Sequence, residues 1–266
     1  MDIIQAIILS IVEGVTEFLP VSSTGHMILA SYIMKIHDQA FVKTFEIAIQ
    51  IGAILAIVML YYKRFIHGIT IYIKLFIALI PTALVGFLAY KTIKTYLFNP
   101  LGVSLALIVG GGILIVIDRW VVSRESRYVE IEDISYKNAF FIGLAQCVSM
   151  IPGVSRAAAT IIGGVGNGLN KKQATEFSFL LAVPTMCAAT GYDLLKTDAT
   201  FTSNELVLLA VGLFGAFISA WLAVKVFIRF VENHGFKAFG YYRIVIGVFF
   251  ILYMIFSGSK SLLEML

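Results

Sequence analysis

Long apolar stretches recur along the chain and are separated by short groups of polar and charged residues. Six of them approach the length of a membrane span: Phe45–Tyr62, Ile69–Tyr90, Leu101–Ile117, Phe177–Leu195, Glu205–Phe230 and Tyr241–Phe256. A helix needs about 20 mainly apolar residues to cross roughly 30 Å of hydrocarbon. The pattern therefore predicts an all-α, polytopic membrane protein with about six full transmembrane helices.

Composition supports this prediction. Hydrophobic residues make up 59% of the chain and charged residues 14%, whereas soluble domains average about 45–50% and about 25%. The formal net charge is only +4, and the basic residues, Arg243 among them, lie mostly at the ends of apolar segments. We interpret them as interfacial anchors and topology signals, and nothing in the sequence indicates nucleic-acid binding.

The two halves of the chain resemble each other. The most polar segment, residues 118–137, is expected to be an aqueous loop or a surface helix near the middle of the chain. With a shift of 133 residues, the segment 13–23 aligns with 146–156 without a gap, and each piece contains a proline and a serine. We interpret residues 1–266 as a single membrane domain built from two repeats, about 1–117 and about 138–266.

Each aligned segment contains a helix breaker, Pro20 in the first and Pro152-Gly153 in the second. Proline removes a backbone donor and disfavours helix at the residue before it. Irregular backbone at membrane depth is tolerated only where it is buried in protein or lines a cavity. The sequence thus predicts inverted repeats, each with a broken or re-entrant helix, whose tips meet at a binding site. Ordinary proline kinks in spanning helices are the alternative.

The first broken segment carries two acids in an apolar setting. A charge near the bilayer centre costs roughly 2.5–3.5 kcal/mol on insertion scales, so such residues are functional candidates. Glu13 and Glu17 are four residues apart and share one helix face, where two carboxylates need a cation or a shared proton. We predict that they bind a divalent cation, Mg²⁺ or Ca²⁺, which would also bind phosphate oxygens. An exposed acidic patch at a helix end is the alternative.

Hydroxyl groups and a histidine follow the same break. One of Ser22 and Ser23 is expected to be the N-cap of the next helix. Ser23 and His26 are three residues apart, so an imidazole could activate the serine as a nucleophile. Attack by His26 itself, or its action on water, is left open. Ser22 and Thr24 are further candidates for substrate binding.

The second broken segment supplies basic and hydroxyl groups. Arg156 follows Ser155 at a predicted helix start, and Thr160 lies one turn later. Guanidinium groups and helix N-termini both bind phosphate oxygens, although an ion pair of Arg156 with Glu13 or Glu17 would also explain the arginine. Together the two segments predict a phosphate or diphosphate site. Glu46, Gln50 and Glu176 are second-tier candidates that could support the site or cap helices.

These motifs resemble those of the undecaprenyl-diphosphate phosphatase family associated with bacitracin resistance. The resemblance rests on two pieces, Glu13-x3-Glu17-Phe-Leu-Pro-Val-Ser-Ser-Thr-Gly-His26 and Pro152-Gly-Val-Ser-Arg156, and extends along the chain. One departure is clear: the family usually continues the second motif with serine and glycine, where this chain has Ala157 and Ala158. No role is therefore assigned to position 157, and alanine in place of glycine at position 158 predicts ordinary helical backbone at that residue.

The resemblance implies a multi-pass enzyme of the bacterial cytoplasmic (inner) membrane whose active site faces outward. It would hydrolyse the polyprenyl diphosphate lipid to its monophosphate and so recycle the carrier for peptidoglycan and other cell-wall polymers. It also implies a divalent-cation requirement, with Glu13 and Glu17 serving metal or water, attack through Ser23 and His26, and phosphate binding by Ser155, Arg156 and Thr160.

Two other functions remain open at this stage, as does a homodimer. A PAP2-type lipid phosphatase uses a similar serine, histidine and arginine set, but the sequence lacks its downstream Ser-Arg-x5-His pattern. A transporter or flippase of polyprenyl phosphate lipids would suit duplicated broken helices equally well. The paired acids beside serine and histidine favour chemistry over transport.

Overall fold

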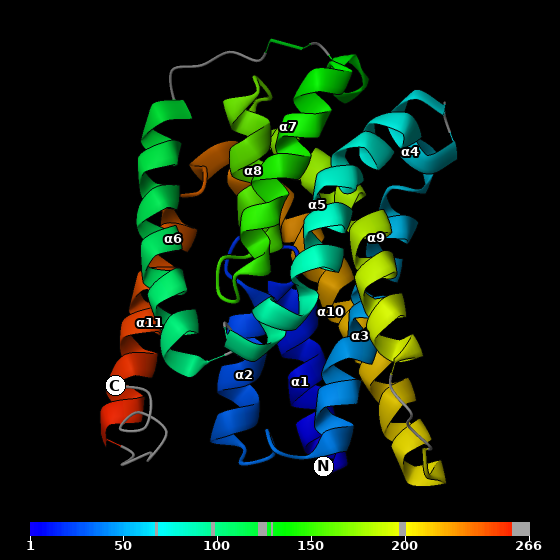
Figure 1. The fold of residues 1–266 in the computed structure, drawn as a ribbon, viewed down its shortest axis with the longest axis vertical. Coiled ribbons are helices and arrows are strands. Elements are labelled where there is room, and N and C mark those ends of the chain that lie inside the picture. Colours follow the sequence, from blue (N-terminus) through cyan, green and yellow to red (C-terminus); the bar gives the residue numbers. More distant parts are fainter. Residues whose placement is uncertain (67–68, 97–98, 122–126, 129, 197–200, 257–266) are drawn as a thin grey trace.

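The computed structural model describes residues 1–66, 69–96, 99–121, 127–128, 130–196 and 201–256. These residues form helices and connecting turns, with no strand among them (Figure 1). In chain order, the α-helices are α1 (Ile3–Thr16), α2 (Ser23–Ile33), α3 (Ala40–Leu60), α4 (Tyr62–Ile66), α5 (Ile69–Tyr96), α6 (Pro100–Val121), α7 (Tyr136–Cys147), α8 (Arg156–Gly166), α9 (Lys171–Leu195), α10 (Ser203–His234) and α11 (Lys237–Phe256). Two short 3₁₀ turns, η1 (Ile131–Asp133) and η2 (Val148–Met150), precede and follow α7.

The six predicted membrane spans are confirmed. Within the described residues, α3, α5, α6, α9, α10 and α11 are long and apolar enough to cross a membrane. Several begin before their apolar stretch because polar capping residues start the helix. Asn170 forms a capping box that begins α9, and Thr202 does the same for α10.

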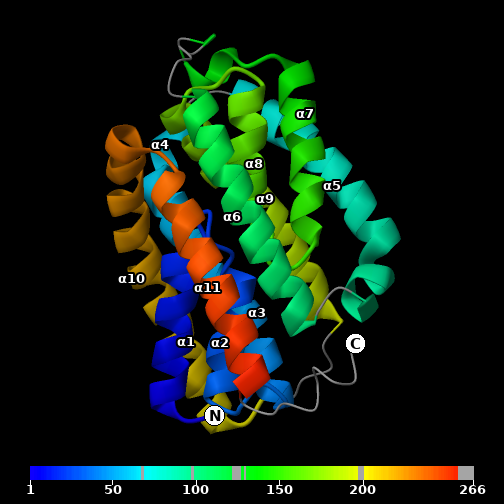
Figure 2. The same cartoon turned by 90° about the vertical axis from the view of Figure 1, so that its left-hand side faces the viewer.

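Both predicted helix breaks are present. The backbone leaves the helix between α1 and α2 and again between α7 and α8, so each pair forms a short hairpin. Figures 1 and 2 show α1 and α2 in the lower half of the molecule and α7 and α8 in the upper half. The two hairpins therefore enter from opposite ends, an arrangement consistent with the predicted inverted repeats.

Each hairpin packs on a long helix of the other half of the chain. Helix α1 lies against α10, while α7 lies against α5, and the pairs α3–α9 and α6–α11 also cross between the halves. The α1–α10 contact is close because Gly14 has no side chain: a Cβ there would lie 2.5 Å from the carbonyl oxygen of Ala216. The meeting point of the hairpins is consequently enclosed by helices from both halves.

The prediction of an aqueous segment from residue 118 was wrong at its start. Asp118 is buried in α6, which continues to Val121. Its carboxylate pairs with Lys171 Nζ at 2.8 Å and accepts a hydrogen bond from the backbone N–H of Phe236 at 2.9 Å. A paired carboxylate can be buried, whereas the pattern of charges alone suggested exposure. Residues 122–126 and 129 of this segment lie outside the described residues.

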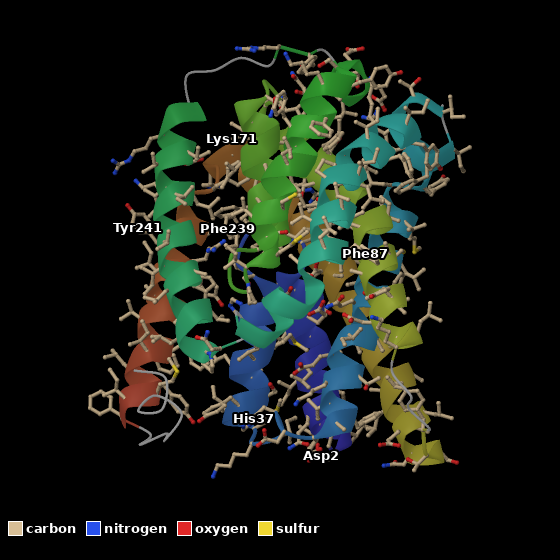
Figure 3. The ribbon with its side chains drawn as sticks, viewed as in Figure 1. Asp2, His37, Phe87, Lys171, Phe239 and Tyr241 are labelled. Carbon is tan, nitrogen blue, oxygen red and sulfur yellow. The ribbon has the colours of Figure 1, made fainter. Side chains whose placement is uncertain are left out.

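Figure 3 shows polar side chains concentrated at the two ends of the long axis. Asp2 and His37 lie at one end and Lys171 lies toward the other, whereas Phe87 projects from the side. Phe87 is 74% exposed, as expected for a side chain that faces lipid.

Candidate active site

The two hairpins turn at equivalent serines. Ser22 and Ser155 adopt positive φ angles of 71° and 75°, in the left-handed region that residues other than glycine rarely occupy. Each is the N-cap of the helix that follows: Ser22 Oγ accepts from the N–H of Gly25 at 3.4 Å, and Ser155 Oγ from Ala158 at 3.2 Å. The structure thus confirms a serine N-cap and brings two helix N-termini together, as predicted.

The hairpin tips are in contact. The hydroxyl of Ser155 donates to the carbonyl oxygen of Leu19 at 3.5 Å, which joins the second tip to the first. This contact agrees with the predicted meeting of the tips.

A carboxylate, a hydroxyl and a guanidinium form the centre of the site. The hydroxyl of Ser23 donates a short hydrogen bond to Glu17 Oε2, and Arg156 Nη2 lies 3.2 Å from Glu17 Oε1. Arg156 Nη1 also donates to the carbonyl of Ser178 at 3.0 Å, and the guanidinium lies 5.6 Å from the ring centre of Phe18. Nε of Arg156 is buried and has no acceptor among the described residues. The guanidinium thus retains one unsatisfied donor.

A cavity of about 440 Å³ opens beside this centre. The predicted site residues on its wall are Glu17, Ser22, Ser23, Thr24, Ser155, Arg156 and Gln50. Gln50 accepts a hydrogen bond from Thr190 at 2.9 Å across the α3–α9 contact. The cavity therefore receives polar groups from both hairpins and from the helices between them.

Thr160 lies behind the cavity wall and not on it. Its hydroxyl is fully buried, donates to the carbonyl of Arg156 at 2.9 Å and lies 2.6 Å from Ser178 Oγ. The geometry gives Thr160 a supporting position: it joins α8 to α9 directly behind the arginine.

Glu13 lies one turn deeper than Glu17 and is 1% exposed. Its Oε1 atom has no hydrogen-bond partner within the part of the chain described, and it interacts electrostatically with Glu17 and Glu46. Glu46 likewise has a buried, unpartnered Oε1 atom. Arg156 interacts with Glu13 and Glu17, and Lys43 with Glu46, so the three carboxylates face two cations and negative charge remains to be compensated by a bound cation or by protons.

Glu176 is placed away from this centre. Its carboxylate lies 3.9 Å from Arg64, which also pairs with Glu132 at 2.8 Å and Glu130 at 3.8 Å. Of the three second-tier residues, Gln50 and Glu46 are therefore near the site, and Glu176 belongs to a separate ion-pair cluster.

The expected pairing of Ser23 with His26 was wrong. His26 Nδ1 lies 2.8 Å from the carbonyl oxygen of Ser22, and Nε2 lies 2.8 Å from the hydroxyl of Tyr242. The hydroxyl of Ser23 donates its hydrogen bond to Glu17 instead. Positions 23 and 26 are neighbours on the helix, but the imidazole bends back toward the helix start and meets α11, which the local spacing could not reveal.

Arg243 is an important residue that the sequence analysis misinterpreted. It is fully buried rather than interfacial, and within the described residues its guanidinium donates to backbone carbonyl groups. Nη1 lies 3.0 Å from Pro20 O and 2.9 Å from Val154 O, and Nη2 lies 2.9 Å from Gly153 O. One arginine of α11 therefore holds the tips of both hairpins. An arginine inside a predicted span, with no acid nearby in the sequence, was the available signal.

The two alanines that depart from the resembling family's second motif directly follow Arg156 but do not line the cavity. Ala157 and Ala158 are in regular helix at the start of α8 and are almost fully buried. This confirms the expected helical backbone at that point, and a hydroxyl at position 157 would not lie on the described cavity wall.

Comparison with known proteins supports the family suggested by the motifs. Residues 6–249 match the family model described as bacitracin resistance protein BacA. A protein of Wolinella succinogenes named undecaprenyl-diphosphatase is 50% identical over 254 residues, which cover 96% of this chain and 99% of the relative. Proteins of the same name from Persephonella marina (51% identity; 96% and 100% covered) and Bdellovibrio bacteriovorus (48%; 97% and 98%) are similarly related.

Proposed function

The chain belongs to the bacitracin resistance protein BacA family, and we propose that it hydrolyses undecaprenyl diphosphate to undecaprenyl phosphate and inorganic phosphate. This reaction would recycle the lipid carrier for peptidoglycan synthesis and confer resistance to bacitracin. The proposal is supported by the names of the relatives and, above all, by the contact of Glu17 with both Ser23 and Arg156 at a membrane-embedded cavity.

Arg156 would bind the terminal phosphate of the substrate. Its free Nε–H and the N-termini of α2 and α8 supply donors at one place, and guanidinium binds phosphate oxygens with charge-assisted hydrogen bonds. These donors would stabilise the negative charge as the phosphoryl group is transferred. The prenyl tail would remain among the apolar side chains between helices.

Ser23 is our candidate nucleophile and Glu17 its base. The serine oxygen would bond to the terminal phosphorus while the bond to the bridging oxygen breaks and the serine proton moves to Glu17. Water would then cleave the phosphoserine and release phosphate. Direct attack by water activated on Glu17 is the competing route, and the existing Ser23–Glu17 hydrogen bond favours the serine.

A divalent cation, Mg²⁺ or Ca²⁺, fits the donors that are present. No group of three or more acidic, histidine or cysteine side chains in the described residues is arranged to hold a metal alone. Magnesium, however, commonly uses one or two carboxylates together with substrate phosphate oxygens. Glu13, with its unpartnered Oε1, and Glu17 would hold the ion. When bound, it would neutralise charge on the diphosphate.

We further propose that the cavity faces the outer side of the cytoplasmic membrane. It extends toward Tyr192 and Asp193 in the last turn of α9, which ends in the half of the molecule that holds the N-terminus (Figure 1). The opposite end carries basic residues on α4, at the end of α6 and at the starts of α7, α9 and α11: Lys63, Arg64, Arg119, Arg127, Lys137, Lys171, Lys172 and Lys237. The half that holds the N-terminus has fewer described basic residues: Lys35, Lys43, Lys91, Lys94 and Lys196. Excess lysine and arginine marks the cytoplasmic side.

Phosphate release from a C55 diphosphate by detergent-purified protein tests the function. We expect phosphate release by the wild type to stop when EDTA is added and to return with Mg²⁺ or Ca²⁺. In Glu17→Gln the rate of release should fall at least about 100-fold, because the base is lost. Ser23→Ala should be equally impaired if serine attacks, whereas near-normal turnover would favour water. Absence of release from folded wild-type protein with any cation would contradict the phosphatase and favour lipid transport.

A further inference from the structure

Tyr242 on α11 contacts the site through His26, and the reaction proposed above uses neither side chain. The tyrosine hydroxyl lies 2.8 Å from His26 Nε2, and the two rings are nearly parallel, with centres 5.6 Å apart and planes inclined by 4°. His26 is 9% exposed and is not part of the described cavity wall, although Ser22 and Ser23 are. The imidazole is therefore directed away from the place where the phosphate would bind.

The two hydrogen bonds determine which ring nitrogen carries the proton. A carbonyl oxygen can only accept, so the 2.8 Å contact with Ser22 O requires a proton on Nδ1. In the neutral ring Nε2 is then an acceptor, and the Tyr242 hydroxyl must be its donor. The carbonyl of Ser22 thus selects the tautomer of His26, and the Tyr242 hydroxyl, which can donate or accept, satisfies Nε2 and fixes the plane of the ring.

The ring in turn holds a backbone conformation that is otherwise unfavourable. Ser22 has a φ of 71°, and its carbonyl accepts from both the imidazole and the backbone N–H of His26, the latter at 3.2 Å. The next residue, Ser23, depends on this turn to place its hydroxyl on Glu17.

The second hairpin makes the same turn without a histidine. The residue equivalent to His26 there is Ala159. In that hairpin the residue after the turn is Arg156, whose long side chain is fixed by Ser178 and Glu17. Ser23 has no comparable side chain, so in the first hairpin the imidazole supplies the anchor.

We propose that Tyr242 is a positioning residue: its hydroxyl binds Nε2 and holds the plane of the His26 ring, so that Nδ1–H stays on the Ser22 carbonyl, fixes the Ser22 turn and keeps the Ser23 hydroxyl on Glu17. His26 then acts as a structural donor and does not attack phosphorus or take the serine proton. The inference concerns the same site and rests on the proposed phosphatase function.

Two substitutions of His26 separate its two contacts. The amide nitrogen of His26→Asn occupies nearly the position of Nδ1 and can donate to Ser22 O, whereas that of His26→Gln lies near Nε2. We expect His26→Asn to retain kcat within about tenfold, the size of one or two neutral hydrogen bonds, and His26→Gln and His26→Ala to lose much more. If His26→Asn is as inactive as His26→Ala while its unfolding temperature is unchanged, the imidazole is chemically required and the proposal is wrong.

Tyr242→Phe tests the positioning role. We expect a loss of about two- to tenfold in kcat with little change in KM, and no further loss when Tyr242→Phe is added to His26→Asn, because the asparagine has no ring to orient. Tyr241→Phe is the matched control, since Tyr241 is the neighbouring residue, 49% exposed and on the outer side of α11 (Figure 3). Equal losses from Tyr242→Phe in both backgrounds would show that the tyrosine acts independently of His26.

The tautomer itself can be observed without any turnover. Nitrogen-15 NMR of histidine-labelled protein, with the His26 signals identified by their absence in His26→Asn, should show the proton on Nδ1 in the wild type. Tyr242→Phe should keep this tautomer but shift the Nε2 signal, because Nε2 loses its donor, whereas Tyr241→Phe should not. A proton on Nε2 in the wild type would overturn the inference. Because this measurement needs no substrate, a failure of the phosphatase proposal would leave it unaffected.

Discussion

Glu17 is bound on both of its carboxylate oxygens, by the Ser23 hydroxyl and by Arg156. Both are charge-assisted hydrogen bonds, which are stronger than neutral ones, and the side chain is only 8% exposed. The pair is also close to neutral overall, which lowers the cost of burying it before the substrate arrives. An incoming phosphate would compete with Glu17 for the guanidinium, and this exchange would release the carboxylate to accept the serine proton.

Substitution of Arg156 tests whether the arginine binds phosphate or only pairs with Glu17. Arg156→Lys keeps the charge but loses the planar set of donors, and Arg156→Ala loses both. We expect kcat/KM to fall about 100-fold or more in Arg156→Ala, with a smaller loss in Arg156→Lys. Arg64→Lys, in the distant ion-pair cluster, should have little effect. Unaltered kinetics in Arg156→Ala would remove the residue from the site.

The identity of the central residues was predictable from the sequence, but their pairing was not. Glu17 and Arg156 stood out because ionisable groups are costly at membrane depth. Ser23 stood out because it and Glu17 lie on either side of the helix break at Pro20. The partner of Ser23 depends on which way His26 turns, and that is decided by Tyr242, which is 216 residues away in the sequence. Helix spacing indicates a shared face and does not fix the rotamer.

At the scale of elements, the hairpins are joined to α11 by Arg243. Its guanidinium also donates to Ala106 and Leu107 of α6, at 3.2 and 3.4 Å. All five of its described acceptors are backbone carbonyl groups. Hydrogen bonds to a charged donor are stronger than neutral ones, and the carbonyls of the irregular tips have no helical partner. The arginine thus compensates for the breaks that create the site.

Removal of this arginine should loosen both hairpins together. In Arg243→Ala the carbonyls of Pro20, Gly153 and Val154 lose their donor, and we expect a loss of about 3 kcal/mol or more in the free energy of unfolding. Thermal unfolding in detergent and phosphate release should both decline. Arg229→Ala, an exposed arginine on α10, is the matched control and should unfold like the wild type. If Arg243→Ala unfolds at the same temperature as the wild type, the structure of the hairpin tips does not depend on this arginine.

The elements themselves were largely foreseen, because spans and breaks are local features of the sequence. Pro20 and Pro152-Gly153 marked the breaks, and apolar length marked the spans. The depth of Arg243 was missed because α11 begins at Lys237, before the apolar stretch that starts at Tyr241. The exchange of partners between the halves, with α1 on α10 and α7 on α5, involves long-range contacts that no local pattern encodes.

At the scale of the whole molecule, the two ends differ in their number of basic residues. The proposed orientation in the membrane, with the cavity facing outward, rests on this difference. The sequence alone could not assign it, because basic residues follow nearly every apolar segment. The fold sorts them by end: α4 and the starts of α7, α9 and α11 share the more basic end, opposite the N-terminus (Figure 1). The cavity extends toward the less basic end, so a substrate displayed on the outer leaflet would reach it directly.

Labelling of single cysteines in intact bacterial cells tests this orientation. Both native cysteines, Cys147 and Cys187, are free and would first be replaced by serine. Asp38→Cys, whose parent side chain is 90% exposed at the N-terminal end, should react with a membrane-impermeant maleimide added outside. Lys137→Cys, exposed at the start of α7, should react only after the membrane is permeabilised, because excess basic charge keeps that end cytoplasmic. A variant is used for this assignment only if it releases phosphate at the wild-type rate, which shows that it is correctly folded. The reverse pattern would place the cavity mouth on the cytoplasmic side, and the substrate would then have to be hydrolysed on the inner leaflet.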